Sequence, residues 1–181
     1  MQSQQVIDFW FDELSARQWF TQDSDLDQII GKRFGKLYQQ AVQCELYGWR
    51  STVEGRLAEI IVLDQFSRNM FRGQAAAFAF DPLAVALTQA AIDVGADQEL
   101  VTQPAKLAFL YMPLMHSESS VIHQQAVKKF SQPGLEDNLA FEYRHKAIID
   151  RFGRYPHRNA ILGRESTPEE QQFLTQPGSS F

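Results

Sequence analysis

The stretch that decides the fold is Arg56 to Gly73, RLAEIIVLDQFSRNMFRG. On a helical wheel of 100° per residue, its apolar side chains fall into two sets on two sides of the helix. The first set is Leu57, Ile60, Ile61 and Phe71, and the second is Val62, Leu63, Phe66 and Met70. A helix that is apolar on both sides belongs inside a domain. We therefore predict that this helix is the centre of the core.

Two charged residues interrupt the first apolar side of this central helix. Asp64 and Arg68 lie four residues apart in the middle of that side, and Arg72 follows one turn later. One interpretation is a buried ion pair that fixes the register of the helix. The other is a functional site, in which Arg68 and Arg72 bind a carboxylate or phosphate, Asp64 orients one guanidinium and Asn69 adds a neutral hydrogen bond. The sequence leaves both open.

The rest of the chain also reads as helices. Nothing alternates with a period of two for long enough to be a strand, and 181 residues with 44% hydrophobic content suit one domain with a proper core. We predict an all-α fold of eight or nine helices in antiparallel pairs, with a single domain over 1–175 and a mobile tail over 176–181.

Several local features extend this prediction. Asp23 or Ser24 caps a long helix that runs to about Tyr47. Gly31 and Gly35, on one face of that helix, predict a close approach of another helix. Cys44, at its end, is predicted to be a small buried side chain.

Charge and composition exclude several classes of function. The formal net charge of −5 argues against nucleic-acid binding. No stretch approaches the ~20 apolar residues of a membrane helix, and the beginning of the chain lacks the basic leader of a signal peptide. The single cysteine suits a reducing compartment. We therefore expect a cytoplasmic protein with no membrane association. One basic cluster, between Arg144 and Arg164, stands out on this acidic chain.

A second polar group follows Pro113 in an apolar run. His116 and Glu118 are spaced i, i+2 and cannot share one face of a regular helix, so they do not form a zinc-binding helix motif. A kink at Pro113 would let both side chains turn toward a common cavity. The alternative is a helix-end cap beside a core histidine.

A third polar group lies near the end of the chain. His145 shares a helical stripe with Phe141, Ile148 and Phe152, which predicts that it points inward. The segment after that helix is dense in hydrogen-bond donors and lacks apolar periodicity. Such a loop either binds a ligand or ties itself down through backbone carbonyls, and we favour binding. The candidate residues of this third group are His145, Arg151, Arg154, His157, Arg158 and Asn159.

Three long motifs carry a resemblance to a known family. They are LDQFSRN (63–69), FLYMPLMHSE (109–118) and RFGRYPHRNAILGRESTPEE (151–170). Together they resemble a widely distributed bacterial family of unknown function in the tetratricopeptide-like all-helical superfamily. Ser67 stands where that family often has proline. The resemblance implies a superhelix of antiparallel helix pairs with a concave surface, and it assigns no role to the motifs.

The leading functional hypothesis is a binding module. Its central pocket, lined by arginine and histidine, holds a small anionic ligand or a peptide carboxylate. The rival is an enzyme that acts on an anionic substrate, with His116, Glu118 and His157 as acid–base candidates. A third class is a structural or oligomerising protein with a buried polar network. No spacing supports a metal site, no cofactor is expected, and the sequence does not determine the oligomeric state.

Overall fold

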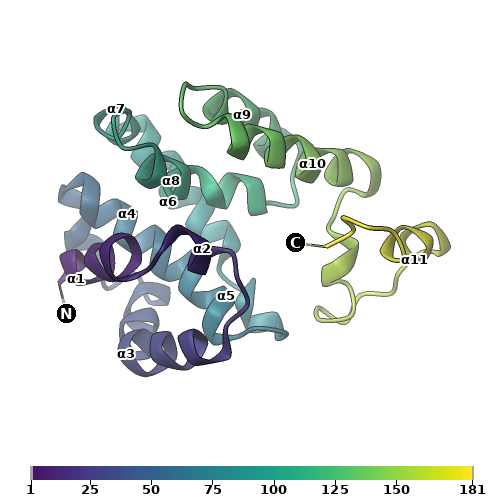
Figure 1. Ribbon diagram of the computed structural model, residues 1–181, viewed down its shortest axis with the longest axis horizontal. Coiled ribbons are helices and arrows are strands. Elements are labelled where there is room, and N and C mark those ends of the chain that lie inside the picture. The colour runs from purple at the N-terminus through teal and green to yellow at the C-terminus, as the bar shows by residue number, and fades with distance from the viewer. Residues whose placement is uncertain (1, 181) are drawn as a thin grey trace. The chain divides into compact units, whose positions relative to one another are not determined.

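The computed structural model describes residues 2–180, and these residues form helices and turns without a strand (Figure 1). The prediction of an all-α fold is confirmed. In chain order the α-helices are α1 (Ser3–Asp8), α2 (Ala16–Trp19), α3 (Ser24–Val42), α4 (Val53–Ile61), α5 (Ser67–Met70), α6 (Asp81–Asp93), α7 (Ala96–Glu99), α8 (Pro104–His116), α9 (Ser120–Phe130), α10 (Glu136–Phe152) and α11 (Pro168–Leu174). Short π or 3-10 turns, η1 (Phe9–Glu13), η2 (Tyr47–Ser51), η3 (Val62–Phe66), η4 (Ala75–Ala77) and η5 (Pro156–Arg158), join or extend them.

The chain divides into two compact units. The first, here called the N-terminal unit, runs to Arg72 and resumes over Ala76–Pro113. The second, the C-terminal unit, holds Gly73–Ala75 and the chain from Leu114 onward. The single domain over 1–175 and the tetratricopeptide-like superhelix stay predictions.

The N-terminal unit is built around α4 and η3, as the apolar pattern of 56–73 predicted. Its residues Leu57, Ile60, Ile61, Val62, Leu63 and Phe66 are all completely buried. Helix α4 packs against α1 and α6, and η3 packs against α3. Burial on every side explains why the helix is apolar on both sides.

The π turn η3 alters the geometry that a regular wheel assumes. A π turn has hydrogen bonds from i to i+5, so it shifts the facing of every later side chain relative to a regular α-helix. The whole of η3 is buried, including Asp64 and Gln65. Met70 and Phe71, predicted on opposite apolar sides, are only half-buried. A helical wheel drawn at a fixed 100° per residue cannot predict this change of helical pitch at Val62.

Helix starts were predicted better than helix ends. The Asp23 carboxylate accepts from the backbone N–H groups of Asp25 and Leu26, which confirms it as the cap of α3. This helix ends at Val42, however, because the chain turns at Cys44, where φ is +58°. Cys44 is exposed, so the prediction of a buried side chain is wrong. A Cβ on Gly35 would meet nothing within 4 Å, so the predicted close approach is wrong there.

The C-terminal unit is organised by the hairpin of α9 and α10, which lie side by side (Figure 1). Ile148, Ile149 and Tyr155 form an apolar cluster, against which Phe152 and Phe173 pack. Helix α11 starts with a capping box, in which the Thr167 hydroxyl and the Glu170 side chain satisfy each other's backbone N–H groups. The end of the chain also contacts this unit, since Ser179 is buried. The mobility of the tail stays a prediction.

Among the described residues, one helical stretch is long and apolar enough to cross a membrane. It runs over Ala75–Asp93, with a hydropathy of 1.5. A core helix of a soluble protein can have the same length and apolar composition. In this stretch, Ala84, Thr88 and Ala91 are completely buried. The expectation that no stretch approaches the length and apolar composition of a membrane helix is therefore wrong for Ala75–Asp93, by length and composition alone.

Gly55 at the start of α4 tests the packing of the N-terminal unit. A Cβ there would lie 1.9 Å from the carbonyl oxygen of Trp49, a backbone atom that cannot move aside. We expect Gly55→Ala to lower the free energy of unfolding by about 2 to 4 kcal/mol in urea. Gly35→Ala is the matched control, because it adds a methyl group in open space within a helix. It should raise stability by about 0.5 to 1 kcal/mol, and equal effects of the two changes would contradict the packing described.

Candidate functional site

The predicted site residues fall in both units. Asp64, Arg68, Asn69 and Arg72 lie in the N-terminal unit, and the other eight, from His116 to Asn159, lie in the C-terminal unit. Each group is therefore described within its own unit. That all twelve line one central pocket stays a prediction.

Arg68 is held between two carboxylates of the N-terminal unit. Its Nη1 and Nη2 donate to the two carboxylate oxygens of Asp81 at 3.0 and 2.9 Å. Nη1 also donates to the Asp64 carbonyl at 2.7 Å and lies 3.3 Å from the Asp64 carboxylate. The prediction that this helix buries a charged pair is confirmed for Asp64, which is completely covered, whereas the Arg68 side chain is 19% exposed. The sequence analysis did not predict Asp81 as the partner of Arg68.

Arg72 and Asn69 share a second carboxylate, that of Asp27 on α3. Arg72 donates through Nε and Nη2 at 2.7 and 2.8 Å, and the Asn69 amide donates at 2.8 Å. Partial burial raises the pKa of Asp27, but the bonds from Arg72 and Asn69 outweigh it and hold the pKa below its usual value. Asp27 is therefore ionised at neutral pH. The contact ties the end of the central helix to the start of α3.

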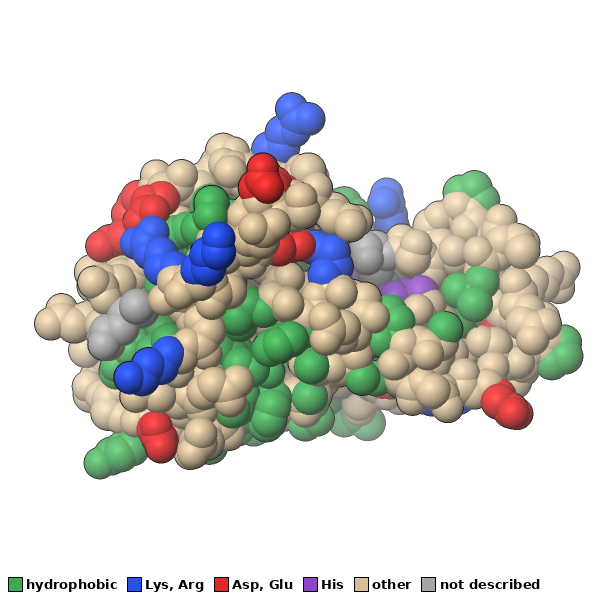
Figure 2. Space-filling view, turned by 90° about the horizontal axis from the view of Figure 1, so that it is seen from below, with side chains coloured by type: hydrophobic (Ala, Val, Ile, Leu, Met, Phe, Trp, Pro, Cys, Tyr) green, Lys and Arg blue, Asp and Glu red, His purple; other side chains and the backbone are tan. Residues whose placement is uncertain are grey.

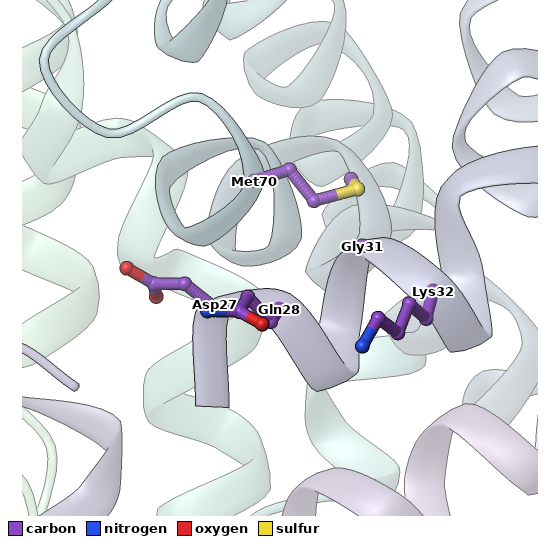
Figure 3. Close-up of a pocket in the computed structure, with 5 residues that line it drawn as sticks. All are labelled: Asp27, Gln28, Gly31, Lys32 and Met70. Carbon is purple, nitrogen blue, oxygen red and sulfur yellow. The ribbon is translucent and has the colours of Figure 1, made fainter. Parts of the chain in front are cut away.

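A hollow of about 330 Å³ lies beside this contact (Figure 3). Four residues of α3 and one of α5 line it, namely Asp27, Gln28, Gly31, Lys32 and Met70. None of the twelve predicted site residues lines this hollow. It is a shallow feature between α3 and α5 in which Asp27 already has its partners.

In the C-terminal unit, Glu118 joins two of the three motifs. Its carboxylate accepts from both terminal nitrogens of Arg164, at 2.6 and 2.9 Å, and from the Tyr155 backbone N–H at 2.7 Å. Half-burial raises the pKa of Glu118, but these hydrogen bonds outweigh it, so the pKa lies below its usual value. The motif at 109–118 and the motif at 151–170 thus meet at one ionised carboxylate.

A second acid, Glu170 of α11, binds side chains of the segment that follows α10. Arg154 donates to both of its carboxylate oxygens at 2.7 and 2.8 Å, and the Asn159 amide donates at 3.3 Å. The bond from Arg154 is the main reason that the pKa of Glu170 falls to about 2. Arg151 contacts Glu169 on the surface, with both side chains about half-exposed.

The segment between α10 and α11 is therefore held in place chiefly by hydrogen bonds to the carboxylates of Glu118 and Glu170. The sequence analysis considered only backbone carbonyls for this role. Arg158 adds a further internal contact, because its guanidinium lies 4.6 Å from the centre of the Tyr155 ring. Arg164 and Glu170 were visible in the sequence, but their pairing depends on a fold that brings 118, 164 and 170 together.

The histidines of this unit are mostly covered. His145 points inward as predicted, and its Nδ1 lies 2.8 Å from the Phe141 carbonyl. Burial lowers the pKa of His145 to about 3, and burial with the nearby Arg158 lowers the pKa of His157 to about 4. Both imidazoles are neutral at pH 7. Histidine surface is visible on one face of the molecule (Figure 2), and the half-buried histidines are His116 and His157.

The sequence analysis missed a buried network around His123. Nδ1 of His123 lies 2.7 Å from Glu142, and both side chains are completely buried. Nε2 lies 2.9 Å from the Ser117 carbonyl and 3.2 Å from the Tyr155 hydroxyl, which donates to the Met115 carbonyl. Both groups can only accept from Nε2, so Nε2 carries hydrogen. Burial raises the pKa of Glu142 above its usual value, although the hydrogen bond with His123 opposes that rise.

A signal for this network was present in the sequence. His123 shares a stripe with Ala126 and Phe130, and Glu142 shares one with His145 and Ile149. A histidine and an acid on the apolar stripes of two consecutive helices predict a buried pair once those helices form a hairpin.

Three of the predicted site residues, Glu118, His145 and His157, have pKa values displaced from their usual values. A general acid or base works best with a pKa near the working pH. The pKa of Glu118 is below its usual value, and the pKa values of His145 and His157 are near 3 and 4. Among the described residues, no three His, Cys, Asp or Glu side chains are grouped to hold a metal ion.

The comparisons with known proteins identify a class that is all-helical and without an assigned activity. The family of bacterial proteins of unknown function (DUF924) matches residues 6–178, and the chain belongs to this family. The solved structure of ATU0120, a protein of unknown function from Agrobacterium tumefaciens, is 39% identical. The two structures superpose with a TM-score of 0.89, and the match covers 95% of this chain and 96% of the ATU0120 chain. Among curated proteins, no significant match is found.

The low pKa of His145 predicts that the protein loses stability in acid. In the unfolded chain His145 binds a proton below about pH 6.5, whereas the folded protein resists until about pH 3. Stability therefore falls as the pH drops between those values. His145→Gln should reduce the slope of unfolding free energy against pH by about 1.4 kcal/mol per unit between pH 4 and 6.

The measurement is urea unfolding at pH 4.5, 5.5, 6.5 and 7.5. Arg144→Gln on the exposed side of α10 is the control, since arginine does not titrate in this range. An unchanged slope in His145→Gln would show that His145 is not held neutral by the fold.

Proposed function

We propose that this protein is a structural helical scaffold, in which the arginines of the three motifs serve the fold. The observation that carries the proposal is that four arginines each hold an internal carboxylate through two nitrogens. The pairs are Arg68–Asp81, Arg72–Asp27, Arg154–Glu170 and Arg164–Glu118. The two-nitrogen geometry that would recognise an external carboxylate or phosphate is already used.

An external anion would have to displace these internal acids. Displacement would leave a covered carboxylate such as Glu170 without its counter-charge, at a large cost in free energy. The proposal also includes a cellular location. An exposed, free Cys44 suits a reducing compartment, and we place the scaffold in the cytoplasm.

The second candidate is the binding of a small anionic ligand or a peptide carboxylate in the C-terminal unit. It is favoured by the meeting of two motifs at Glu118, whose side chain and that of Arg164 are about a quarter exposed. A ligand carboxylate would take the place of Glu118 on Arg164. This candidate predicts that added anions raise the melting temperature of the protein.

Replacement of Arg164 tests the scaffold. We expect Arg164→Met to lower the free energy of unfolding by about 2 to 3 kcal/mol, because it leaves Glu118 half-buried and without its partner. Arg33→Met is the matched control, because Arg33 contacts Glu13 through two nitrogens at 2.6 and 2.7 Å on the surface. Its cost should stay below about 1 kcal/mol.

Thermal-shift measurements with inorganic phosphate, citrate and short peptides separate the two candidates. The scaffold predicts melting temperatures that are the same with and without these probes at equal ionic strength. A midpoint that rises with probe concentration, and that Arg164→Met abolishes, would overturn the scaffold in favour of anion binding.

A further inference from the structure

The four histidines of the chain all lie in the C-terminal unit, and they lie close together. Three of them surround Tyr155, because the ring centres of His123, His145 and His157 lie 6.3, 5.9 and 5.5 Å from the centre of its ring. The fourth, His116, acts electrostatically on His145 and so belongs to the same group. We call these four residues the histidine cluster.

The inner part of the histidine cluster is unfavourable for positive charge. His123 is completely buried, and His145 is nearly so. The Phe141 carbonyl can only accept, so Nδ1 of His145 carries hydrogen and an added proton would go to Nε2. Burial is the main reason that the pKa of His145 is low, and charge on the other three histidines lowers it further, although the bond to Phe141 acts the other way.

The two carboxylates that act on the cluster already have partners. Glu118 favours the protonated form of His157, but it accepts hydrogen bonds from Arg164 and from the Tyr155 backbone N–H. Glu142 is bound to His123. A proton added to His145 or His157 would therefore have to share a carboxylate that another group is using.

The cations around the cluster oppose its protonation. The Arg158 guanidinium lies 4.6 Å from the centre of the Tyr155 ring, and Arg158 and Arg164 both lower the pKa of His157, after burial. Lys146 and Asp150, the other charged groups that act on Glu142, form an ion pair with each other. The charges that face the cluster thus favour neutral imidazoles in the closed unit.

From this arrangement we propose that the histidine cluster makes the C-terminal unit an acid-sensitive switch, which opens in mild acid while the N-terminal unit stays folded. In the opened unit the histidines take up protons below about pH 6.5. Because the closed unit resists that uptake, a falling pH favours the opened form. His116 and His157 are half-buried, so protons from solvent reach the edge of the cluster.

The N-terminal unit responds to acid at a lower pH. Its ion pairs use carboxylates such as Asp27, whose pKa lies below its usual value, and aspartates of an unfolded chain take up protons only near about pH 4. Between pH 6.5 and 4, the loss of stability therefore falls mainly on the C-terminal unit. The inference goes beyond the scaffold and does not depend on it.

The chain supplies a separate reporter for each unit. The three tryptophans, Trp10, Trp19 and Trp49, all lie in the N-terminal unit, whereas the four histidines lie in the C-terminal unit. NMR spectra of the isotope-labelled full chain, recorded from pH 7.5 to pH 4, follow both units in one sample. We expect the imidazole signals to move to the positions of unfolded histidine while the indole N–H signals keep their folded positions. His145 and His157 should each raise the equilibrium constant for opening about tenfold per pH unit below pH 6.

Two substitutions in the cluster test its role. The double variant His145→Gln, His157→Gln removes two titrating rings and keeps an amide donor at each position, so its C-terminal unit should open at a pH lower by about one unit or more. Gln124→His is the matched control, because position 124 is exposed on α9 and a histidine there takes up its proton equally in both forms. It should leave the midpoint unchanged. If the double variant is unfolded at pH 7.5, His157→Gln alone should give a smaller shift in the same direction.

Three results would each overturn the switch. The first is loss of the indole signals at the same pH as the imidazole signals, which would show that the chain unfolds as one unit. The second is a set of imidazoles that titrate near pH 6.5 while the unit stays folded. The third is an unchanged midpoint in the glutamine variants.

Discussion

The interaction on which the polar structure depends is the pairing of a covered arginine with an internal carboxylate. A charge that leaves water needs a partner of opposite charge and hydrogen bonds for its remaining donors or acceptors. Arg68 meets this need through Asp81 and Asp64, and Arg164 meets it through Glu118 and two groups of the loop, Asn159 and the Tyr155 carbonyl. The pairs Arg68–Asp81 and Arg164–Glu118 join segments that are 13 and 46 residues apart in the chain. The same contacts explain why the motifs are rich in arginine and why most of those arginines are not free.

The C-terminal unit adds a second kind of polar constraint, a hydrogen-bond network whose His123 and Glu142 side chains are completely buried. His123 bridges Glu142 of α10 and the Ser117 carbonyl that follows α8, and Tyr155 closes the network from the loop. Every one of these segments is fixed by at least one hydrogen bond in a region closed to water. The network therefore specifies how the α9–α10 hairpin meets the end of α8, while the ion pairs of Glu118 and Glu170 fix the loop around it.

How much was predictable depended on the range of the interaction. Apolar periodicity predicted the all-helical class and the central, buried helix, and the local cap at Asp23 predicted the start of α3. The inward side chain of His145 also followed from periodicity. The partners of Arg68, Arg72 and Arg164 lie 13, 45 and 46 residues away. No local pattern contains such a pairing, and the π turn at Val62 shifted the wheel that placed the later residues.

The most direct test of the account is a double-mutant cycle between Glu118 and Arg164. Urea unfolding of Glu118→Gln, Arg164→Met and the double variant gives the coupling free energy of the pair without contributions from the rest of the fold. The account predicts a coupling of about 1 to 3 kcal/mol, with the double variant less destabilised than the sum of the single variants. A coupling near zero would contradict it, because the arginine would then be available to something other than the fold.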